Sequence, residues 1–345
     1  MEKRDTNAEN FLAEMVAAEH FSGVAMVNRG GQVIHKRAYG PASEDQDNHV
    51  DGRFHVASIA KQFTAAAVMQ LVEMGKVRLE GRINDYLPEA YRSERWDAVS
   101  VANLLAHSSG IPDYAVTRDY YAVVDGWAFD ATIDGMIREA MARPLDFEPG
   151  SQFRYCNLGY TLLGKIIEAP SGLRYADYIR QALLDPLGME SSEVHDEGYI
   201  ARPEDAAGLR WDYQLGCHIR DEVVSLPVTP ADGGLVTTLD DFARWVAVYR
   251  FMEHPKLSSA SVERMLTQAA PADTYRWPER NMRGQGFYGL GLMRSGDLIM
   301  HEGSIVGFRS FFLYSQDEDL LITVFSNNTN NDVFRIASGL FELYA

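Results

Sequence analysis

Apolar and polar residues alternate near both ends of the chain, as they do in β-strands with one buried face. Residues 22–40 alternate around the turn Arg-Gly-Gly-Gln at 29–32, a pattern typical of a hairpin. Residues 289–303 and 308–328 form two further alternating segments, each with a polar turn near its middle. Both ends of the chain are therefore predicted to contribute antiparallel strands.

Helical periodicity occupies the chain between these strands and at its two ends. Residues 8–20 and about 331–344 are predicted as terminal helices, and the Ala-rich segment 60–75 as a helix packed in a core. From about residue 81 to 229 the pattern changes to helices separated by long loops that contain prolines. The helical stretches there are 100–108, 132–142, 159–172 and 175–188.

This arrangement predicts an α+β fold, in which a mostly antiparallel sheet flanked by helices is assembled from both ends of the chain. The sheet domain is expected to comprise residues 1–80 and 230–345, with a mainly helical domain, residues 81–229, inserted between them. A chain of 345 residues is long enough for the large core that such a fold requires.

The net charge argues against some classes of partner. The chain holds 32 Lys and Arg against 49 Asp and Glu, which gives −17 at pH 7. A protein this acidic is not expected to bind nucleic acid or an anionic membrane, and no segment approaches the ~18 apolar residues of a membrane span. We therefore expect a small-molecule partner, and the oligomeric state stays open.

Cysteine usage and the N-terminal segment bear on the compartment. Cys156 and Cys217 are too few for a disulfide framework, so they are either free thiols or a single pair. The first 20 residues are polar and amphipathic and lack the apolar core and cleavage site of a signal peptide. We expect a cytoplasmic protein, or a periplasmic or secreted one if a leader has been removed.

A serine and a lysine, Ser58 and Lys61, stand three residues apart at the start of the apolar helix. A serine hydroxyl is a weak nucleophile until a neighbouring base takes its proton, and a lysine can be that base when desolvation lowers its pKa. Free N–H groups at the helix start can also bind an oxyanion. The alternative is a Ser58 that caps the helix and a Lys61 that reaches to water, which so short a motif does not exclude.

The segment Tyr-Cys-Asn at 155–157 is a second candidate motif. Tyr155 beside a lysine could ionise partly and shuttle a proton. Asn157 could hold Lys61 by its oxygen and a substrate amide by its nitrogen. Taken alone, a tyrosine at this position is more often a core residue with a satisfied hydroxyl.

The segment His-Glu-Gly-Ser at 301–304 is a third, on a predicted strand. His301 could polarise a substrate or complete a proton network near neutral pH, although a lone histidine on a strand is usually structural. Gly303 would let a substrate backbone approach, and the N–H of Ser304 could be an oxyanion donor.

The order of the three motifs resembles that of a known enzyme family. S-x-x-K, S-D-N and K-T-G together mark β-lactamases and penicillin-binding proteins. Here the second and third read Y-C-N and H-E-G, which is similar to the class C β-lactamase branch of the serine penicillin-recognising hydrolases, a branch that includes esterases and D-amino-acid peptidases. The resemblance extends from about residue 21 to 327 and includes "NLLAHSSGIPDY", "FEPGSQFRYCNLGYTLLGKIIE" and "GGLVTTLDDFARW".

The resemblance implies a role for each matching residue. Ser58 would be the acylated nucleophile, Lys61 and Tyr155 the proton-transfer pair, and Asn157 the residue that orients them. The N–H groups of Ser58 and Ser304 would form the oxyanion hole. The fold implied is a mostly antiparallel sheet flanked by helices plus a helical domain, in agreement with the pattern of strands and helices.

One departure from the family pattern bears on the substrate. His301 stands where many members carry a lysine, whose fixed charge suits a carboxylate such as that of a β-lactam. A histidine with an ordinary pKa of ~6.5 would be mostly neutral at pH 7. Glu302 is also unusual, and it could tune His301, repel anionic substrates or point to solvent. Because family members with H-x-G are often esterases or peptidases, we expect ester hydrolysis well above β-lactam hydrolysis.

Aromatic residues after residue 112 are candidates for an apolar acyl or alcohol pocket, because the family places this region beside the cleft. Alternatively they cover the helical domain. They are Tyr114, Tyr120, Tyr121 and Trp127. The "HSSG" turn at 107–110, in contrast, is a packing feature in the family and is not expected to be catalytic. Nine histidines are scattered without metal-ligand spacing, so no metal or cofactor is expected.

The sequence thus predicts a serine hydrolase that works through an acyl-enzyme on Ser58, with an ester, amide or lactam as its substrate. An esterase for short-chain carboxylic esters, with weak or no β-lactamase activity, is the favoured interpretation. A D-amino-acid peptidase, a DD-peptidase and a β-lactamase are the enzymatic alternatives. A catalytically silent ligand-binding or assembly protein of the same fold is the non-enzymatic one.

Overall fold

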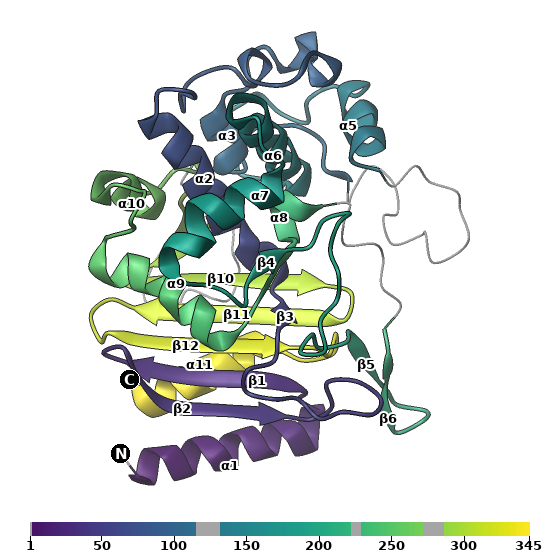
Figure 1. The fold of residues 1–345 in the computed structure, drawn as a ribbon, viewed down its shortest axis with the longest axis vertical. Helices are drawn as coiled ribbons and strands as arrows, with labels where there is room; N and C mark the ends of the chain where they lie inside the picture. Colours follow the sequence, from purple (N-terminus) through teal and green to yellow (C-terminus); the bar gives the residue numbers. More distant parts are fainter. Residues whose placement is uncertain (1, 115–131, 222–228, 272–285) are drawn as a thin grey trace.

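A seven-stranded antiparallel sheet organises the part of the chain that the computed structural model describes, residues 2–114, 132–221, 229–271 and 286–345 (Figure 1). The strand order is β2-β1-β12-β11-β10-β9-β8. The strands are β1 Gly23–Arg29, β2 Gln32–Tyr39, β8 Gly286–Tyr288, β9 Met293–Ser295, β10 Leu298–Ile305, β11 Phe308–Ser315 and β12 Leu320–Ser326. β1 pairs with β12, so strands from the two ends of the chain meet inside one sheet. The predicted fold class is confirmed; the division into two domains stays a prediction.

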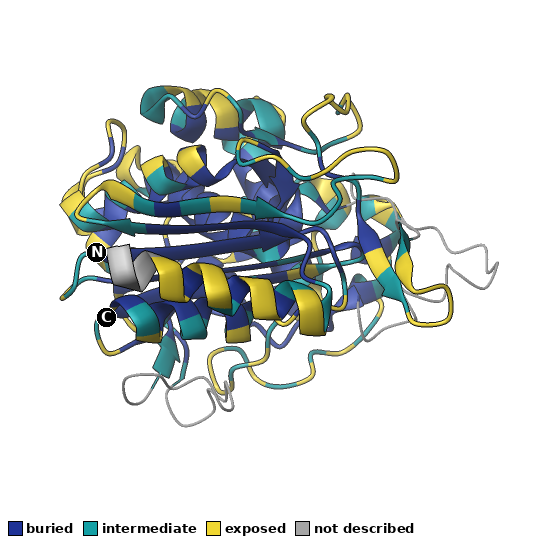
Figure 2. Ribbon diagram, turned by 90° about the horizontal axis from the view of Figure 1, so that it is seen from below, coloured by how far each residue is buried: buried dark blue, intermediate teal, exposed yellow. Residues whose placement is uncertain are grey.

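Helices cover both faces of this sheet. α1 (Glu2–Glu19) and α11 (Val333–Tyr344) lie over one face, and α2 (Lys61–Glu73), α6 (Asn157–Ser171) and α9 (Leu239–Phe251) lie on the other side (Figure 1). The alternation along β1 follows from this arrangement, because Val24 belongs to the core on the α2 side and Ala25 to the core on the α1 side. Figure 2 shows the result, a buried sheet behind the exposed outer face of α1.

The remaining described helices are short. They are α3 Val101–Leu105, α5 Ile133–Met141, α7 Tyr175–Ile179, α8 Pro230–Gly233 and α10 Ser259–Leu266, with short 3-10 helices η1 Ala57–Ala60, η2 Ile83–Asp85, η3 Glu89–Tyr91, η4 Glu94–Trp96 and η7 Asp185–Leu187, and a π-helical turn η6 Arg180–Leu184. None of the helices in the described ranges is both long and apolar enough to cross a bilayer.

Two predicted helices differ from the observed ones. α1 begins at Glu2 rather than at residue 8, since the polar segment before residue 8 contains neither Pro nor Gly to stop the helix. The helix predicted at 60–75 is preceded by η1, a tighter 3-10 turn, and α2 itself begins only at Lys61. That difference matters because η1 contains Ser58.

Two small sheets were not predicted. One has the order β3-β7-β4, with β3 Phe54–His55, β4 Glu193–Val194 and β7 Leu235–Thr237, and the other pairs β5 Leu209–Asp212 with β6 Cys217–Arg220. Strands of two to four residues are too short to show a period in the sequence. The first of these sheets nevertheless positions the site, because β3 leads directly into η1.

Candidate active site

Ser58 lies in a turn that is hydrogen-bonded to β7 and to β11 through the backbone of Val56. The preceding residue, Ala57, has a left-handed φ of +48°, a conformation that costs about 1–2 kcal/mol and that often occurs at functional sites. Val56 anchors the turn, because its N–H donates to the Leu235 carbonyl at 3.1 Å and its carbonyl accepts from Ser310 Oγ at 2.7 Å. The candidate nucleophile is therefore presented by a fixed strand-to-helix turn.

Lys61 is the first residue of α2, and its side chain is completely buried. Its Nζ lies 3.1 Å from Ser58 Oγ, 2.9 Å from Asn157 Oδ1 and 2.7 Å from the carbonyl oxygen of Asp232. The 3-10 geometry of η1 aligns residues three apart, so Ser58 and Lys61 meet although the α-helix begins only at the lysine. The alternative in which Lys61 reaches to water is wrong.

The partners of Lys61 favour a lone pair directed at Ser58. Asn157 Oδ1 and the Asp232 carbonyl oxygen can only accept, so they take the two hydrogens of a neutral amine and leave its lone pair for Ser58 Oγ. Burial lowers the pKa of Lys61 to about 8, against the raising effect of the Asp232 and Asp113 carboxylates. At pH 7 about a tenth of the molecules then hold Lys61 as a free amine, the form that a general base requires.

Asn157, the first residue of α6, is oriented by a carboxylate. Asp113 Oδ2 accepts from Asn157 Nδ2 at 3.2 Å, and Asp113 Oδ1 accepts from the N–H groups of Leu158 and Tyr114 at 2.9 and 3.0 Å. The amide oxygen of Asn157 consequently faces Lys61, as predicted from the sequence. Its nitrogen donates one hydrogen to the Asp113 carboxylate; binding of a substrate amide through the second hydrogen stays a prediction.

Tyr155 completes the cluster beside Lys61 and keeps its proton. Lys61 Nζ is 4.9 Å from the centre of the Tyr155 ring. Burial raises the pKa of Tyr155 well above its usual value, and the hydrogen bond with Ser58 opposes this less strongly. The expectation that Tyr155 ionises partly is therefore wrong for the free protein. A protonated tyrosine can instead hand a proton to a leaving group.

His301 is buried in β10, and the protein engages both of its ring nitrogens. Nε2 lies 3.0 Å from the Tyr288 hydroxyl, and Nδ1 lies 2.6 Å from the carbonyl oxygen of Glu302. Burial, reinforced by the charge of Lys61, lowers the pKa of His301 to about 3. His301 is thus neutral at pH 7, as predicted, but because it is buried rather than because its pKa is ordinary.

Gly303 serves the contact between β10 and η1. A Cβ at this position would lie 2.1 Å from the Val56 carbonyl oxygen and 2.2 Å from Ser310 Oγ. The expectation that Gly303 makes room for a substrate backbone is therefore wrong, and the glycine instead lets the strand approach the turn that carries Ser58. The next residue, Ser304, is exposed, and its N–H stays the predicted second oxyanion donor.

One of the four predicted pocket aromatics, Tyr114, falls within the described residues; Tyr120, Tyr121 and Trp127 lie outside them. Tyr114 is buried, and its hydroxyl donates to Asp232 Oδ2 at 2.7 Å. A hydroxyl bound to a buried carboxylate makes this part of the site polar rather than an apolar wall.

Both cysteines are free. Cys156 caps the N-terminus of α6, where its sulfur accepts from the Gly159 N–H at 3.3 Å. Burial raises the pKa of the Cys156 thiol well above its usual value, and a thiol that stays protonated is a poor nucleophile. Cys217 is exposed on β6.

Three polar residues of this cluster were missed in the sequence: Asp113, Asp232 and Tyr288. All three are at most 8% exposed. For the two carboxylates the sequence does hold a signal, namely an aspartate among small and apolar residues. An aspartate in such a segment is rarely buried without a partner. The tyrosine gave none, because it reads as an ordinary strand residue.

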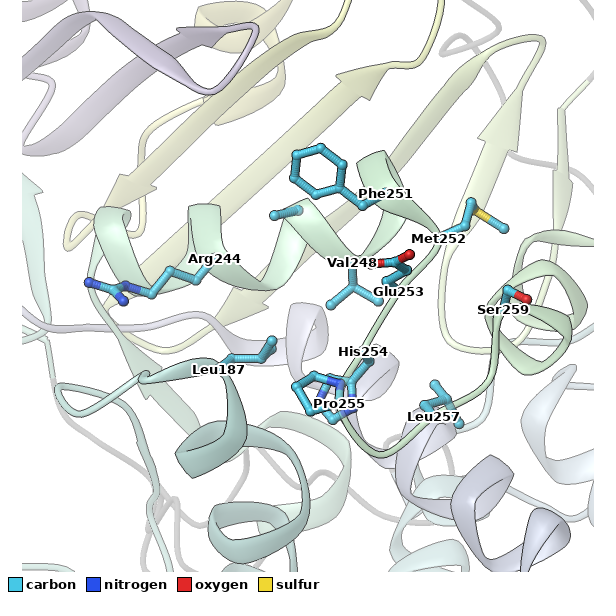
Figure 3. Close-up of a pocket in the computed structure, with 11 residues that line it drawn as sticks. Leu187, Arg244, Val248, Phe251, Met252, Glu253, His254, Pro255, Leu257 and Ser259 are labelled. Atoms are coloured by element: carbon cyan, nitrogen blue, oxygen red, sulfur yellow. The ribbon is translucent and has the colours of Figure 1, made fainter.

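A separate groove, with a volume of about 560 Å³, lies between the end of α9 and the segment before α10 (Figure 3). Phe251, Met252 and Leu257 are among the residues that line it, and no candidate catalytic residue is. In the described ranges of the chain, His, Cys, Asp and Glu form no group of three that could hold a metal. The proposed chemistry therefore rests on the Ser58 cluster.

Comparisons with known proteins place these residues in context. A family model described as "Beta-lactamase" matches residues 8–342. "Penicillin-binding protein 4*" of Bacillus subtilis is 26% identical over 94% of this chain and 72% of its own length. "Protein flp" of Staphylococcus aureus is 25% identical over 93% of this chain, which spans 62% of that protein.

Among solved structures, an octameric penicillin-binding protein homologue from Pyrococcus abyssi superposes with a TM-score of 0.82. It is 29% identical, and the match covers 98% of this chain and 76% of that one. The chain thus shares one fold with these relatives and corresponds to part of each longer protein.

Proposed function

The chain belongs to the Beta-lactamase family of serine hydrolases, and from that premise we propose that it cleaves short-chain carboxylic esters through an acyl-enzyme on Ser58. One observation carries the proposal: a completely buried Lys61 whose Nζ lies 3.1 Å from Ser58 Oγ while two carbonyl-type oxygens take its hydrogens. A lysine in this setting acts as a base, and a serine next to a base acts as a nucleophile.

The proposed reaction moves one proton through the cluster during acylation of Ser58 and one during deacylation. Ser58 Oγ attacks the ester carbonyl as its proton passes to Lys61, and the N–H groups of Ser58 and Ser304 bind the oxyanion. The C–O bond to the alcohol then breaks, and Tyr155 donates a proton to the leaving oxygen and regains one from Lys61. Water deacylates Ser58 by the reverse proton path, so that one ester and one water give an acid and an alcohol.

Esters are preferred to β-lactams in this proposal because, among the described residues of the cluster, neither His301 nor Lys61 offers a free cation for a carboxylate. His301 is neutral and bonded through both nitrogens, and Lys61 is engaged with Ser58 and its two acceptors. A missing charge-assisted hydrogen bond is worth about 1.5–3 kcal/mol, which corresponds to about 10–100-fold in rate.

We expect kcat/KM for p-nitrophenyl butyrate to exceed that for nitrocefin by at least about 10–100-fold, the value of the missing charge-assisted bond. Initial rates on both substrates with the same enzyme preparation would measure this ratio. Spontaneous hydrolysis, recorded with a Ser58→Ala sample, is the control to subtract. Comparable kcat/KM values for the two substrates would contradict the ester assignment.

The pH profile is expected to follow Lys61. The base must be neutral, and burial lowers its pKa to about 8, so kcat/KM for the ester should rise with pH and level off above about 8. The raised pKa of Tyr155 keeps that residue protonated over the same range. Rates from about pH 6 to about pH 10 would test this, and a bell with its maximum near pH 6 would speak against Lys61 as the base.

A second candidate reaction is hydrolysis of amides of D-amino acids. The buried Asp232 carboxylate favours it, because its charge acts on Lys61 and its Oδ2 accepts from the Tyr114 hydroxyl at 2.7 Å. Such a carboxylate could pair with the ammonium group of an aminoacyl substrate. Rates on D-phenylalanine p-nitroanilide, measured beside those on p-nitrophenyl butyrate, distinguish the two reactions. An amidase for D-amino acids should turn over the anilide faster than the butyrate.

A further inference from the structure

A chain of hydrogen bonds links the start of α6 to β10 through a tyrosine of β8. The N–H of Cys156 donates to His107 Nδ1 at 3.1 Å, and His107 Nε2 lies 3.1 Å from the Tyr288 hydroxyl oxygen. That oxygen lies 3.0 Å from His301 Nε2, and His301 Nδ1 lies 2.6 Å from the Glu302 carbonyl oxygen. The two histidines and the tyrosine are each 0% exposed, so bulk water does not compete for these bonds.

The two ends of this chain determine where its protons lie. A backbone N–H can only donate, so His107 Nδ1 carries no hydrogen, and the neutral ring must carry it on Nε2. A backbone carbonyl can only accept, so His301 Nδ1 carries the hydrogen and Nε2 is bare. The two requirements agree at Tyr288, whose oxygen accepts from His107 and whose O–H donates to His301.

We propose that His107, Tyr288 and His301 form a network with this single set of proton positions, and that His107 and Tyr288 are positioning residues for Tyr155 and His301. The geometry that links the network to Tyr155 is a ring contact: the His107 ring centre is 4.1 Å from that of Tyr155, with 31° between the planes. Because Tyr288 fixes the rotation of the His107 ring, it also fixes the surface on which Tyr155 rests.

The network also keeps the charge of both histidines unchanged near neutral pH. Lys61 is the charged group that acts on both histidines, and together with burial it keeps each of them neutral. A protonated His301 would in turn repel the lysine cation. The O–H of Tyr288 opposes that protonation, since it occupies the only nitrogen of His301 that could take a proton.

The proton positions can be measured without any substrate. In protein labelled with 15N-histidine, we expect His107 to show a hydrogen on Nε2 and His301 a hydrogen on Nδ1, with neither ring titrating between about pH 5 and about pH 8. Spectra of His107→Gln and His301→Gln identify the two sets of signals. A hydrogen on the opposite nitrogen of either ring, or titration within that range, would overturn the network whether or not the protein hydrolyses esters.

The positioning role rests on the proposed function and is tested by Tyr288→Phe, which removes the hydroxyl and keeps the ring. We expect kcat for p-nitrophenyl butyrate to fall about 10–100-fold, as for other small misplacements, with KM changed less than about threefold, and the pKa of His301 to rise in the labelled protein. A role in packing alone would lower the melting temperature and leave the kcat of the folded protein and the His301 signals as in wild type.

Tyr249→Phe is the matched control for this variant. Tyr249 is also 0% exposed, and its hydroxyl donates to Gln62 Oε1 at 2.7 Å, without contact to either histidine. It should lose some stability and keep wild-type kcat and histidine spectra. If Tyr288→Phe behaves as Tyr249→Phe does while the wild-type protein is an active esterase, the positioning role is refuted. If the wild-type protein is inactive on esters, the proposed function fails and the tautomer measurement still decides on the network.

Discussion

Replacing Ser58 by alanine is expected to reduce turnover of p-nitrophenyl butyrate by at least about 10⁴-fold, the scale seen when a nucleophile is removed from a serine hydrolase. The reason is geometric as well as chemical. Lys61 Nζ points at Ser58 Oγ from 3.1 Å, and with the hydroxyl gone the base has no reacting group to deprotonate. Because the side chain is small and sits on an anchored turn, the fold should survive the change.

The measurement is the initial rate of wild type and Ser58→Ala, together with the mass of protein quenched during turnover. Wild type should carry a butyryl group on the peptide that contains Ser58, and the variant should carry none. Ser338→Ala is a matched control, since Ser338 lies in α11 over the opposite face of the sheet and its hydroxyl donates to the carbonyl oxygens of Phe334 and Arg335 in the same helix. Weak turnover that is equal in both proteins would remove this ester as a substrate of Ser58 and favour a peptide substrate or a silent binding protein.

The sheet and the serine–lysine contact could be predicted from the sequence, because the strands have a periodic pattern and the contact is local. Alternation placed β1 and β12 on predicted strands, and a spacing of three brought Ser58 and Lys61 together without knowledge of the rest of the fold. Even so, the lysine was expected inside an α-helix, whereas it begins one after a 3-10 turn. For contact between the two side chains this error is small, since three residues make about one turn in either helix.

What the sequence could not supply is the surroundings of these residues. The oxygens that orient Lys61 come from residues 157 and 232, more than 90 residues away along the chain. No periodicity or motif in the sequence predicts a contact between residues so far apart. Burial was equally hidden, and it is burial that reverses the expected partial ionisation of Tyr155 and that lowers the pKa of His301 to about 3. The same holds for Gly303, whose neighbours turned out to be protein atoms rather than a substrate.

The largest effect after loss of the nucleophile is expected for loss of its base. Lys61→Ala should lower kcat/KM for the ester by ~10²-fold or more, the usual contribution of a general base, and Lys61→Met should do the same while it keeps the buried volume filled. Agreement between the two variants would assign the loss to the amine rather than to a cavity. A folded Lys61→Met protein with the wild-type rate would remove Lys61 from the mechanism.

The same variant has a second signature, in stability. The pKa of Lys61 falls from 10.5 to about 8 on folding because the side chain is buried, so below about pH 8 the folded state carries a charge that costs about 3 kcal/mol relative to the unfolded state. Between these two pKa values the unfolded chain binds more protons, and the free energy of unfolding contributed by Lys61 must therefore rise with pH. Urea denaturation at about pH 8 and about pH 10 should show this rise as a difference between wild type and Lys61→Met. Equal pH dependence of the two proteins would mean that the Lys61 amine is not desolvated in solution, and Lys61 could then not be a base with a lowered pKa.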